Sequence, residues 1–327
     1  MWFLPGLPGG RVGLFMRLHH AIADGAAGVA LLGALLDADP DAPPPRRSWV
    51  PAPMPSGREL LVDNVRRRVK ALDRATSRLA RPIDTVRKVR AVWPALREVT
   101  DQHAPRTSLN RPIGPDRRLA VLRSPMDPVR RVAHSQGATV NDVLLAAISG
   151  GLRDLLSGRG DEVDDVVLRA MVPVSLHRGQ PGPARGNRDG AMVVPLPIGV
   201  ADPARRLRLI AAATAERKRR ARPAGGTMFP SPLLQRAFLH VATRQRIFNV
   251  YVANVPGPPV PLRFAGAPVL EIFPVVPIMA NVTLGVGALS YAGQLTVTAV
   301  ADRDTCPDVD VFTEGVRRSL RTLTRAR

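Results

Sequence analysis

The chain has 327 residues, which suits about two domains, and 45% of them are hydrophobic, so a substantial core can form. Its net charge is +20, but the basic runs Arg66–Arg68 and Arg217–Arg222 contain no aromatic residues for stacking on bases, which argues against nucleic-acid binding. The only cysteine, Cys306, excludes a disulfide framework and favours a reducing compartment, so a cytoplasmic location is expected. No run of about 18 apolar residues occurs, so no transmembrane helix is predicted.

The first forty residues are predicted to contain a strand, a histidine pair and a helix. Residues Arg11–Leu18 have the pattern of a strand that runs into His19 and His20. Small and apolar residues then lie on nearly every side of a predicted helix at Gly25–Leu36, which indicates that it is buried. The proline-rich stretch Asp39–Ser56 is predicted to be an irregular linker.

The following section is rich in arginine. Residues Arg58–Val99 are predicted to form two amphipathic helices that break near Pro82, and Gln102–Asp116 is predicted to be irregular. Apolar side chains recur at helical spacing in the first of these helices, at Leu61, Val65, Val69 and Leu72. We therefore divide the chain into residues 1–40, 41–116 and 117–327.

From residue 117 onward the sequence mixes strands and helices. The predicted strands are Leu119–Arg123, Val166–Val172, Ala191–Leu196, Asn249–Ala253, Val269–Val276, Asn281–Ser290 and Gln294–Val300. The predicted helices are Pro128–Gln136, Thr139–Leu156 with Thr139 or Asn141 near its cap, Pro203–Arg222, Pro232–Phe248 and Asp308–Leu323. Because the order is not a strict βαβ alternation, we expect an α/β fold with a mixed sheet, of the α+β kind.

The segment HHxxxDG, from His19 to Gly25, is the best candidate for catalysis. A histidine with an ordinary pKa near 6.5 can take a proton from a hydroxyl group as its oxygen attacks an acyl carbon. Asp24 could brace the turn, and Gly25 would allow a chain or ligand to approach closely. A metal site is not expected, because adjacent strand residues point to opposite faces and no Cys or Glu stands at zinc-ligand spacing.

Three later segments carry asparagine residues in distinctive surroundings. They are Thr139–Ala146, which contains Asn141 and Asp142, then Arg185–Asn187 followed by Met192–Pro197, and Ala253–Pro258, which contains Asn254. Each has an ordinary structural explanation as well. Asn141 could be a helix N-cap, Asn187 could hold a glycine-rich loop, and Asn254 could belong to a turn that ends a strand.

Taken in this order, the four segments resemble the bacterial wax ester synthase/diacylglycerol acyltransferase family of the chloramphenicol acetyltransferase-like superfamily. The resemblance implies two acetyltransferase-like domains with the active site at their interface. Family members carry a longer segment before HHxxxDG, so the first domain is expected to be incomplete. His20 is the implied general base, with His19 beside it, and Asp24, Gly25, Asn141, Asp142, Asn187 and Asn254 are the implied supporting residues.

The resemblance also implies the substrates: a long-chain acyl group passes from acyl-CoA to diacylglycerol, giving triacylglycerol, or to a long-chain alcohol, giving a wax ester. Acyl-CoA is then a substrate, and no cofactor is expected. Lipid acceptors imply peripheral contact with an anionic membrane or a lipid droplet, for which the helices between Arg58 and Arg90 are candidates. Two alternatives stay open: another HxxxDG enzyme of the condensation type, and a non-catalytic lipid- or membrane-binding remnant.

Overall fold

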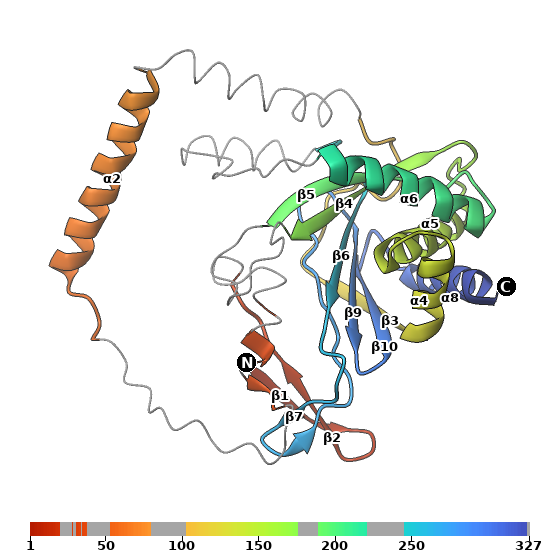
Figure 1. Cartoon of the computed structure of the whole chain (residues 1–327), viewed down its shortest axis with the longest axis horizontal. Coiled ribbons are helices and arrows are strands. Elements are labelled where there is room, and N and C mark those ends of the chain that lie inside the picture. The colour runs from red at the N-terminus through yellow and green to blue at the C-terminus, as the bar shows by residue number, and fades with distance from the viewer. Residues whose placement is uncertain are drawn as a thin grey trace. The chain divides into compact units, whose positions relative to one another are not determined.

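The computed structural model describes residues 1–19, 28, 31–33, 35–37, 53–79, 103–175, 189–220 and 245–325 (Figure 1). The chain divides into two compact units, of which the larger comprises Met1–Pro40 and Ala104–Arg327 and the smaller Asp41–His103. The two units are described separately below.

A mixed six-stranded sheet forms the centre of the larger unit, with the strand order β3-β10-β9-β6-β4-β5. Its strands are β3 (Arg117–Pro125), β4 (Val167–Ser175), β5 (Asp189–Pro197), β6 (Val250–Pro256), β9 (Leu284–Tyr291) and β10 (Gln294–Asp302). Strand β6 is parallel to β4 and β9, and the other neighbours are antiparallel. The mixed sheet and six of the seven strands predicted after residue 117 are thus confirmed.

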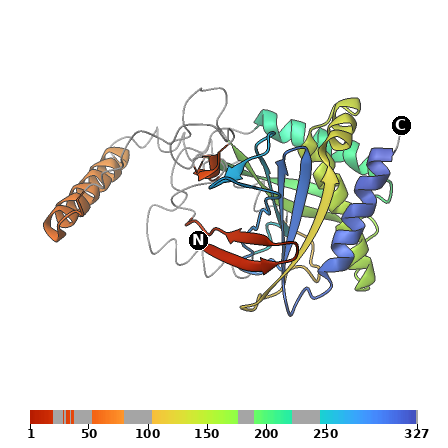
Figure 2. The same cartoon turned by 90° about the horizontal axis from the view of Figure 1, so that it is seen from below.

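Four helices cover one face of this sheet, as both views show (Figures 1 and 2). They are α4 (Met126–Ser135), α5 (Val140–Gly158), α6 (Pro203–Arg220) and α8 (Val309–Arg325). Helix α8 is amphipathic: its buried residues Val309, Phe312, Val316 and Leu320 recur at helical spacing. Helix α5 is buried along most of its length, so it forms the middle of the core.

Helices α5 and α8 approach each other closely because glycine lies at their contact. A Cβ atom added to Gly151 would lie 2.5 Å from Cγ2 of Val316 and 2.6 Å from the carbonyl oxygen of Phe312. On the opposite helix, a Cβ on Gly315 would lie 2.8 Å from the Cα of Gly151. The distance between the two helices therefore depends on the absence of side chains at these two positions.

The predicted strand at Val269–Val276 is wrong, since residues 269–279 form no strand. Pro274 and Pro277 lack the N–H groups that a ladder of strand hydrogen bonds needs. Instead, the segment packs on the sheet face opposite the helices, with Val276 and Ile278 buried in a separate apolar cluster. Strand β9 carries Gly285 and Gly287 beneath it, and a Cβ on Gly287 would clash with the carbonyl of Pro274.

Two hairpins also belong to the larger unit: β1 (Trp2–Leu7) with β2 (Arg11–Phe15), and β7 (Arg263–Phe264) with β8 (Ala267–Pro268). The predicted strand at residues 11–18 is confirmed over β2, whereas β1, which contains Pro5, was not predicted. Gly28, Leu31–Gly33 and Leu35 are helical, as expected, but Leu35 is 42% exposed, so its predicted burial is wrong.

In the smaller unit, helix α2 (Gly57–Leu79) confirms the first arginine-rich helix. Its start is fixed by a capping box, in which the backbone N–H of Ser56 donates to Oε2 of Glu59 at 2.7 Å and the Glu59 N–H donates to the Ser56 hydroxyl at 3.3 Å. Most of the predicted linker and the whole of the second predicted arginine-rich helix lie outside the described residues. Most of the predicted helix Pro232–Phe248 lies outside them as well, and its described residues, 245–248, are not helical. Across the described ranges, no helix combines the length and apolar character needed to cross a bilayer.

The glycine contact between α5 and α8 gives a matched pair of variants. We expect Gly151→Ala to lower the free energy of unfolding by about 1–3 kcal/mol, because the new methyl group overpacks the contact. In the same helix, a Cβ on Gly158 would meet no heavy atom within 4 Å, so Gly158→Ala should leave the stability unchanged or raise it. Urea unfolding of both variants checks this, and equal effects would contradict the packing argument.

Candidate functional site

The residues proposed for catalysis divide into two groups. His20, Asp24, Gly25 and Asn187 lie outside the described residues, so their roles stay predictions. His19 is the last described residue before that gap, and its side chain is exposed. The contacts of three further candidates, at the start of α5 and near the end of β6, are described below.

Asp142 is the best-anchored of the candidates. It is 2% exposed, and its Oδ2 accepts hydrogen bonds from the backbone N–H of Thr139 at 2.8 Å and from the Thr139 hydroxyl at 2.7 Å. Its Oδ1 accepts a hydrogen bond from the hydroxyl of Thr214, in α6, at 2.7 Å. Both carboxylate oxygens are therefore used to cap α5 and to join it to α6.

Asn141 differs from its neighbour although both belong to the first turn of α5. The N-cap is Thr139, so the interpretation of Asn141 as a cap is wrong. The Asn141 side chain is partly exposed, and in the described part of the chain its amide makes no hydrogen bond. It lies where the free N–H groups and the dipole of a helix favour negative charge, so its amide is available to a ligand.

Asn254 lies inside β6, opposite Ala288 of β9, rather than in the turn that follows. That turn begins at Gly257, whose N–H donates to the hydroxyl of Ser290 at 3.3 Å. A Cβ at this glycine would clash with the Ser290 carbonyl, which explains the glycine of the Asn-Val-Pro-Gly-Pro segment. Among the described residues, no hydrogen bond joins Asn254 to Asn141.

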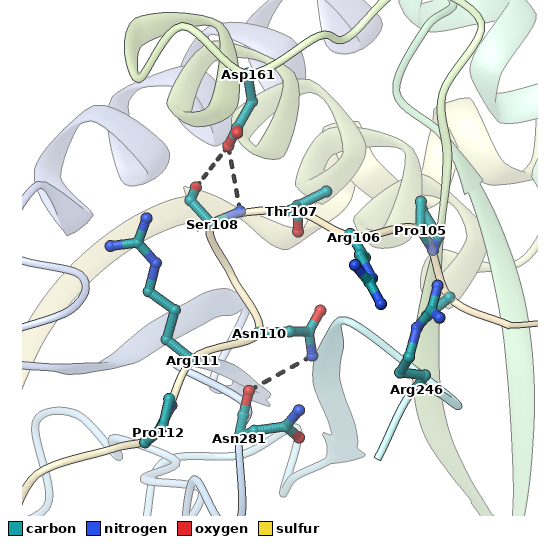
Figure 3. Close-up of a pocket in the computed structure, with 11 residues that line it drawn as sticks. Pro105, Arg106, Thr107, Ser108, Asn110, Arg111, Pro112, Asp161, Arg246 and Asn281 are labelled. Carbon is teal, nitrogen blue, oxygen red and sulfur yellow. Dashed lines mark hydrogen bonds between the residues drawn. The ribbon is translucent and has the colours of Figure 1, made fainter. Parts of the chain in front are cut away.

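An open cavity of about 580 Å³, which no local sequence pattern indicates, is shown in Figure 3. Its lining comes from Ala104–Ser108, Asn110–Pro112, Asp161, Arg246 and Asn281. Behind this lining, Nδ2 of Asn249 donates to Oδ1 of Asn110 at 2.7 Å, although the two residues are far apart in sequence. Only the folded chain brings these amides together, so no spacing rule could find them.

An ion pair between the end of α5 and the start of α8 also holds the segment that lines the cavity. Nε of Arg159 donates to Oδ2 of Asp308 at 2.7 Å, and Nη1 of Arg159 donates to the hydroxyl of Ser108 at 3.0 Å. The hydrogen bond from Arg159 lowers the pKa of the Asp308 carboxyl. Burial raises the pKa of the nearby Cys306 thiol to about 11, so this cysteine is protonated at neutral pH and unsuited to be a nucleophile.

Comparison with known proteins identifies the family. The family model described as the wax ester synthase/diacylglycerol acyltransferase catalytic domain matches residues 1–144, and the one described as the WS/DGAT C-terminal domain matches residues 185–324. A Mycobacterium tuberculosis protein with the provisional name diacylglycerol O-acyltransferase Rv1760 is 32% identical, over 99% of this chain and 66% of its own length. A second protein of that organism, also provisionally named, is the diacylglycerol O-acyltransferase tgs1. It is 30% identical, over 99% of this chain and 70% of its own length.

The chain belongs to the wax ester synthase/diacylglycerol acyltransferase family. It spans about two thirds of the length of these relatives. The wax ester synthase/diacylglycerol acyltransferase of Marinobacter aquaeolei VT8 has a similar structure, with a TM-score of 0.61 and 24% identity over 94% of this chain and 65% of that one. The resemblance inferred from the four sequence segments is confirmed, and so is the mixed α/β fold expected from the order of the predicted strands and helices.

Within this family motif, Asn141 and Asp142 can be separated by their effects on stability. We expect Asp142→Ala to lower the free energy of unfolding by about 2 kcal/mol or more, because it removes both the cap of α5 and the buried hydrogen bond that joins α5 to Thr214 of α6. Asn141→Ala should change it by less than about 0.5 kcal/mol, because that partly exposed side chain has no hydrogen bond to lose within the described part of the chain. Urea unfolding measures both, and a loss of similar size in the two variants would refute the assignment.

Proposed function

We propose that this chain is an O-acyltransferase that moves a long-chain acyl group from acyl-CoA to diacylglycerol or to a long-chain alcohol. The observation that carries the proposal is the match of both family models, in order, with HHxxxDG inside the catalytic one. The names of the mycobacterial relatives favour diacylglycerol as the acceptor, and hence triacylglycerol as the product.

In the proposed reaction, His20 takes the proton of the acceptor hydroxyl while the oxygen attacks the thioester carbonyl. The new C–O bond replaces the C–S bond, and His20 returns the proton to the thiolate of CoA. The acyl group passes directly between the substrates, without an acyl-enzyme. The burial of Cys306 supports this route, because the only thiol of the chain is packed in the core.

The developing negative charge on the carbonyl oxygen needs a hydrogen-bond donor. We assign this role to Asn141, whose amide has no structural partner in the described part of the chain and lies at the N-terminus of α5. Asp142 is unsuited to proton transfer, because both of its oxygens already accept hydrogen bonds. We assign Asp24 to the shape of the HHxxxDG turn rather than to proton transfer, and Gly25, Asn187 and Asn254 to support of the site.

The two adjacent histidines provide the test of the mechanism. We expect His20→Ala to abolish acyl transfer, and His19→Ala to retain a measurable part of it, because the second histidine of the family motif is the proposed base. The measurement is the rate of triacylglycerol and wax ester formation by the 327-residue chain, with circular dichroism as the control for folding. A folded His20→Ala protein that keeps most of the activity would refute the proposal.

We also propose that α2 brings the enzyme to the anionic surface where its lipid acceptor resides. Apolar side chains are exposed on this helix at Leu60, Leu61, Val62, Val65 and Val69. The same helix carries Arg66–Arg68 and Lys70, and each cation near an anionic bilayer contributes about 1 kcal/mol. Apolar and cationic groups on one helix are the combination that binds at a membrane interface.

This proposal predicts salt-sensitive binding to vesicles. Co-sedimentation with anionic vesicles should be strong at low salt and weak at 1 M salt, where the screening length is about 3 Å. Arg66→Gln/Arg68→Gln should weaken it, whereas Arg131→Gln, which removes an exposed charge from α4, should have less effect. Equal binding to neutral and anionic vesicles, unaffected by salt, would rule out the electrostatic attachment.

A further inference from the structure

The cavity beside residues 104–112 concentrates positive charge. Three arginines line it, Arg106, Arg111 and Arg246, and all three are exposed. In the described part of the chain, none of them has an acidic partner or a hydrogen-bond acceptor for its guanidinium group. The only carboxylate in the lining is Asp161, so the formal charge of the lining is +2, from three arginines and one aspartate.

Asp161 does not face the arginines as a free counter-ion. Its Oδ2 accepts hydrogen bonds from the Ser108 hydroxyl at 2.6 Å and from the Ser108 backbone N–H at 3.3 Å (Figure 3). Arg106 and Arg246 lie on the side of Asn110 opposite Arg111 in this view. Their backbones run close together, since the N–H of Ala104 donates to the carbonyl of Arg246 at 2.7 Å. Two like charges are thus held in one cavity, an arrangement that an anion would stabilise.

The backbone that carries these arginines is fixed by buried amides. Asn249, which is fully buried, donates from Nδ2 to the carbonyl of Pro105 at 2.9 Å and accepts a hydrogen bond from the N–H of Arg169 in β4 at 3.0 Å. Gln245 accepts a hydrogen bond from the N–H of Ile247 at 2.7 Å, and its Nε2 donates to Oδ1 of Asn281 at 3.0 Å. The cavity wall is therefore organised before any ligand arrives, which lowers the entropic cost of binding.

We propose that this cavity binds the phosphate group of a small organic phosphate ester, held chiefly by Arg106 and Arg246. Guanidinium groups match phosphate oxygens in charge and in fork geometry. The volume of about 580 Å³ is that of a site for a small organic molecule rather than for a bare ion. The phosphate could belong to a nucleotide, such as the one in CoA, or to a glycerophosphate headgroup. Of these two assignments, only the one to the nucleotide of CoA rests on the proposed acyltransferase function.

The test is calorimetric titration of the full chain with adenosine 3′,5′-bisphosphate and, separately, with glycerol 3-phosphate. We expect the bisphosphate to bind the unaltered chain, and Arg106→Gln/Arg246→Gln to weaken binding about tenfold or more, the usual effect of losing charge-assisted hydrogen bonds. The matched control, Arg131→Gln/Arg208→Gln, removes two exposed charges from α4 and α6 and should bind like the unaltered chain. Arg106→Lys/Arg246→Lys should give an intermediate affinity, because the charge stays and the fork is lost.

Binding of glycerol 3-phosphate alone, with the same dependence on the two arginines, would keep the phosphate site and assign it to a headgroup. The proposal is overturned if neither compound binds, or if the double glutamine variant binds as tightly as its control. Equal melting temperatures of the variants confirm that folding is intact, which is expected because both side chains are exposed. The titration measures binding and involves no acyl transfer. Failure of the phosphate-site proposal can therefore be distinguished from failure of the proposed enzymatic function.

Discussion

The hydrogen bonds of the Asp142 carboxylate are the interaction on which the arrangement around α5 depends. One oxygen closes the capping box with Thr139, and the other ties α5 to Thr214 of α6. The helix so anchored runs through the core, where Gly151 allows α8 to lie against it. The same anchoring holds Asn141 in the first turn, where its side-chain amide makes no hydrogen bond within the described part of the chain. Asp142 therefore stabilises the helix, and the adjacent Asn141 is available to bind a substrate.

Local signals in the sequence were sufficient for much of the fold. Alternating apolar residues predicted β10, and an apolar segment with Thr139 or Asn141 near its cap predicted α5. In both cases the contacts in the fold reinforce the local preference. The order of the four motif segments was sufficient for the family. It could not assign roles within the pair Asn141–Asp142, because both residues favour helix starts and only the contact with Thr214 separates them.

What the sequence could not predict depends on contacts between distant segments. The stretch 269–276 has the apolar residues of a strand, but Pro274 and the glycines of β9 make it pack across the sheet instead. Strand β1 forms despite Pro5 because β2 pairs with it. The arginine cavity joins residues from 104–112 with Arg246 and Asn281, which no local pattern connects. His20 and Asn187 lie outside the described residues, so their proposed roles are tested by activity measurements on variants.

The most direct measurement follows a labelled long-chain acyl group when the purified 327-residue chain is mixed with labelled acyl-CoA and diacylglycerol. Direct transfer predicts that the label appears in triacylglycerol in an amount equal to the CoA released, that omission of the acceptor stops CoA release, and that no label remains on the protein. Label recovered as free fatty acid or bound covalently to the protein, or no release of CoA at all, would contradict the assignment of this chain as a direct O-acyltransferase.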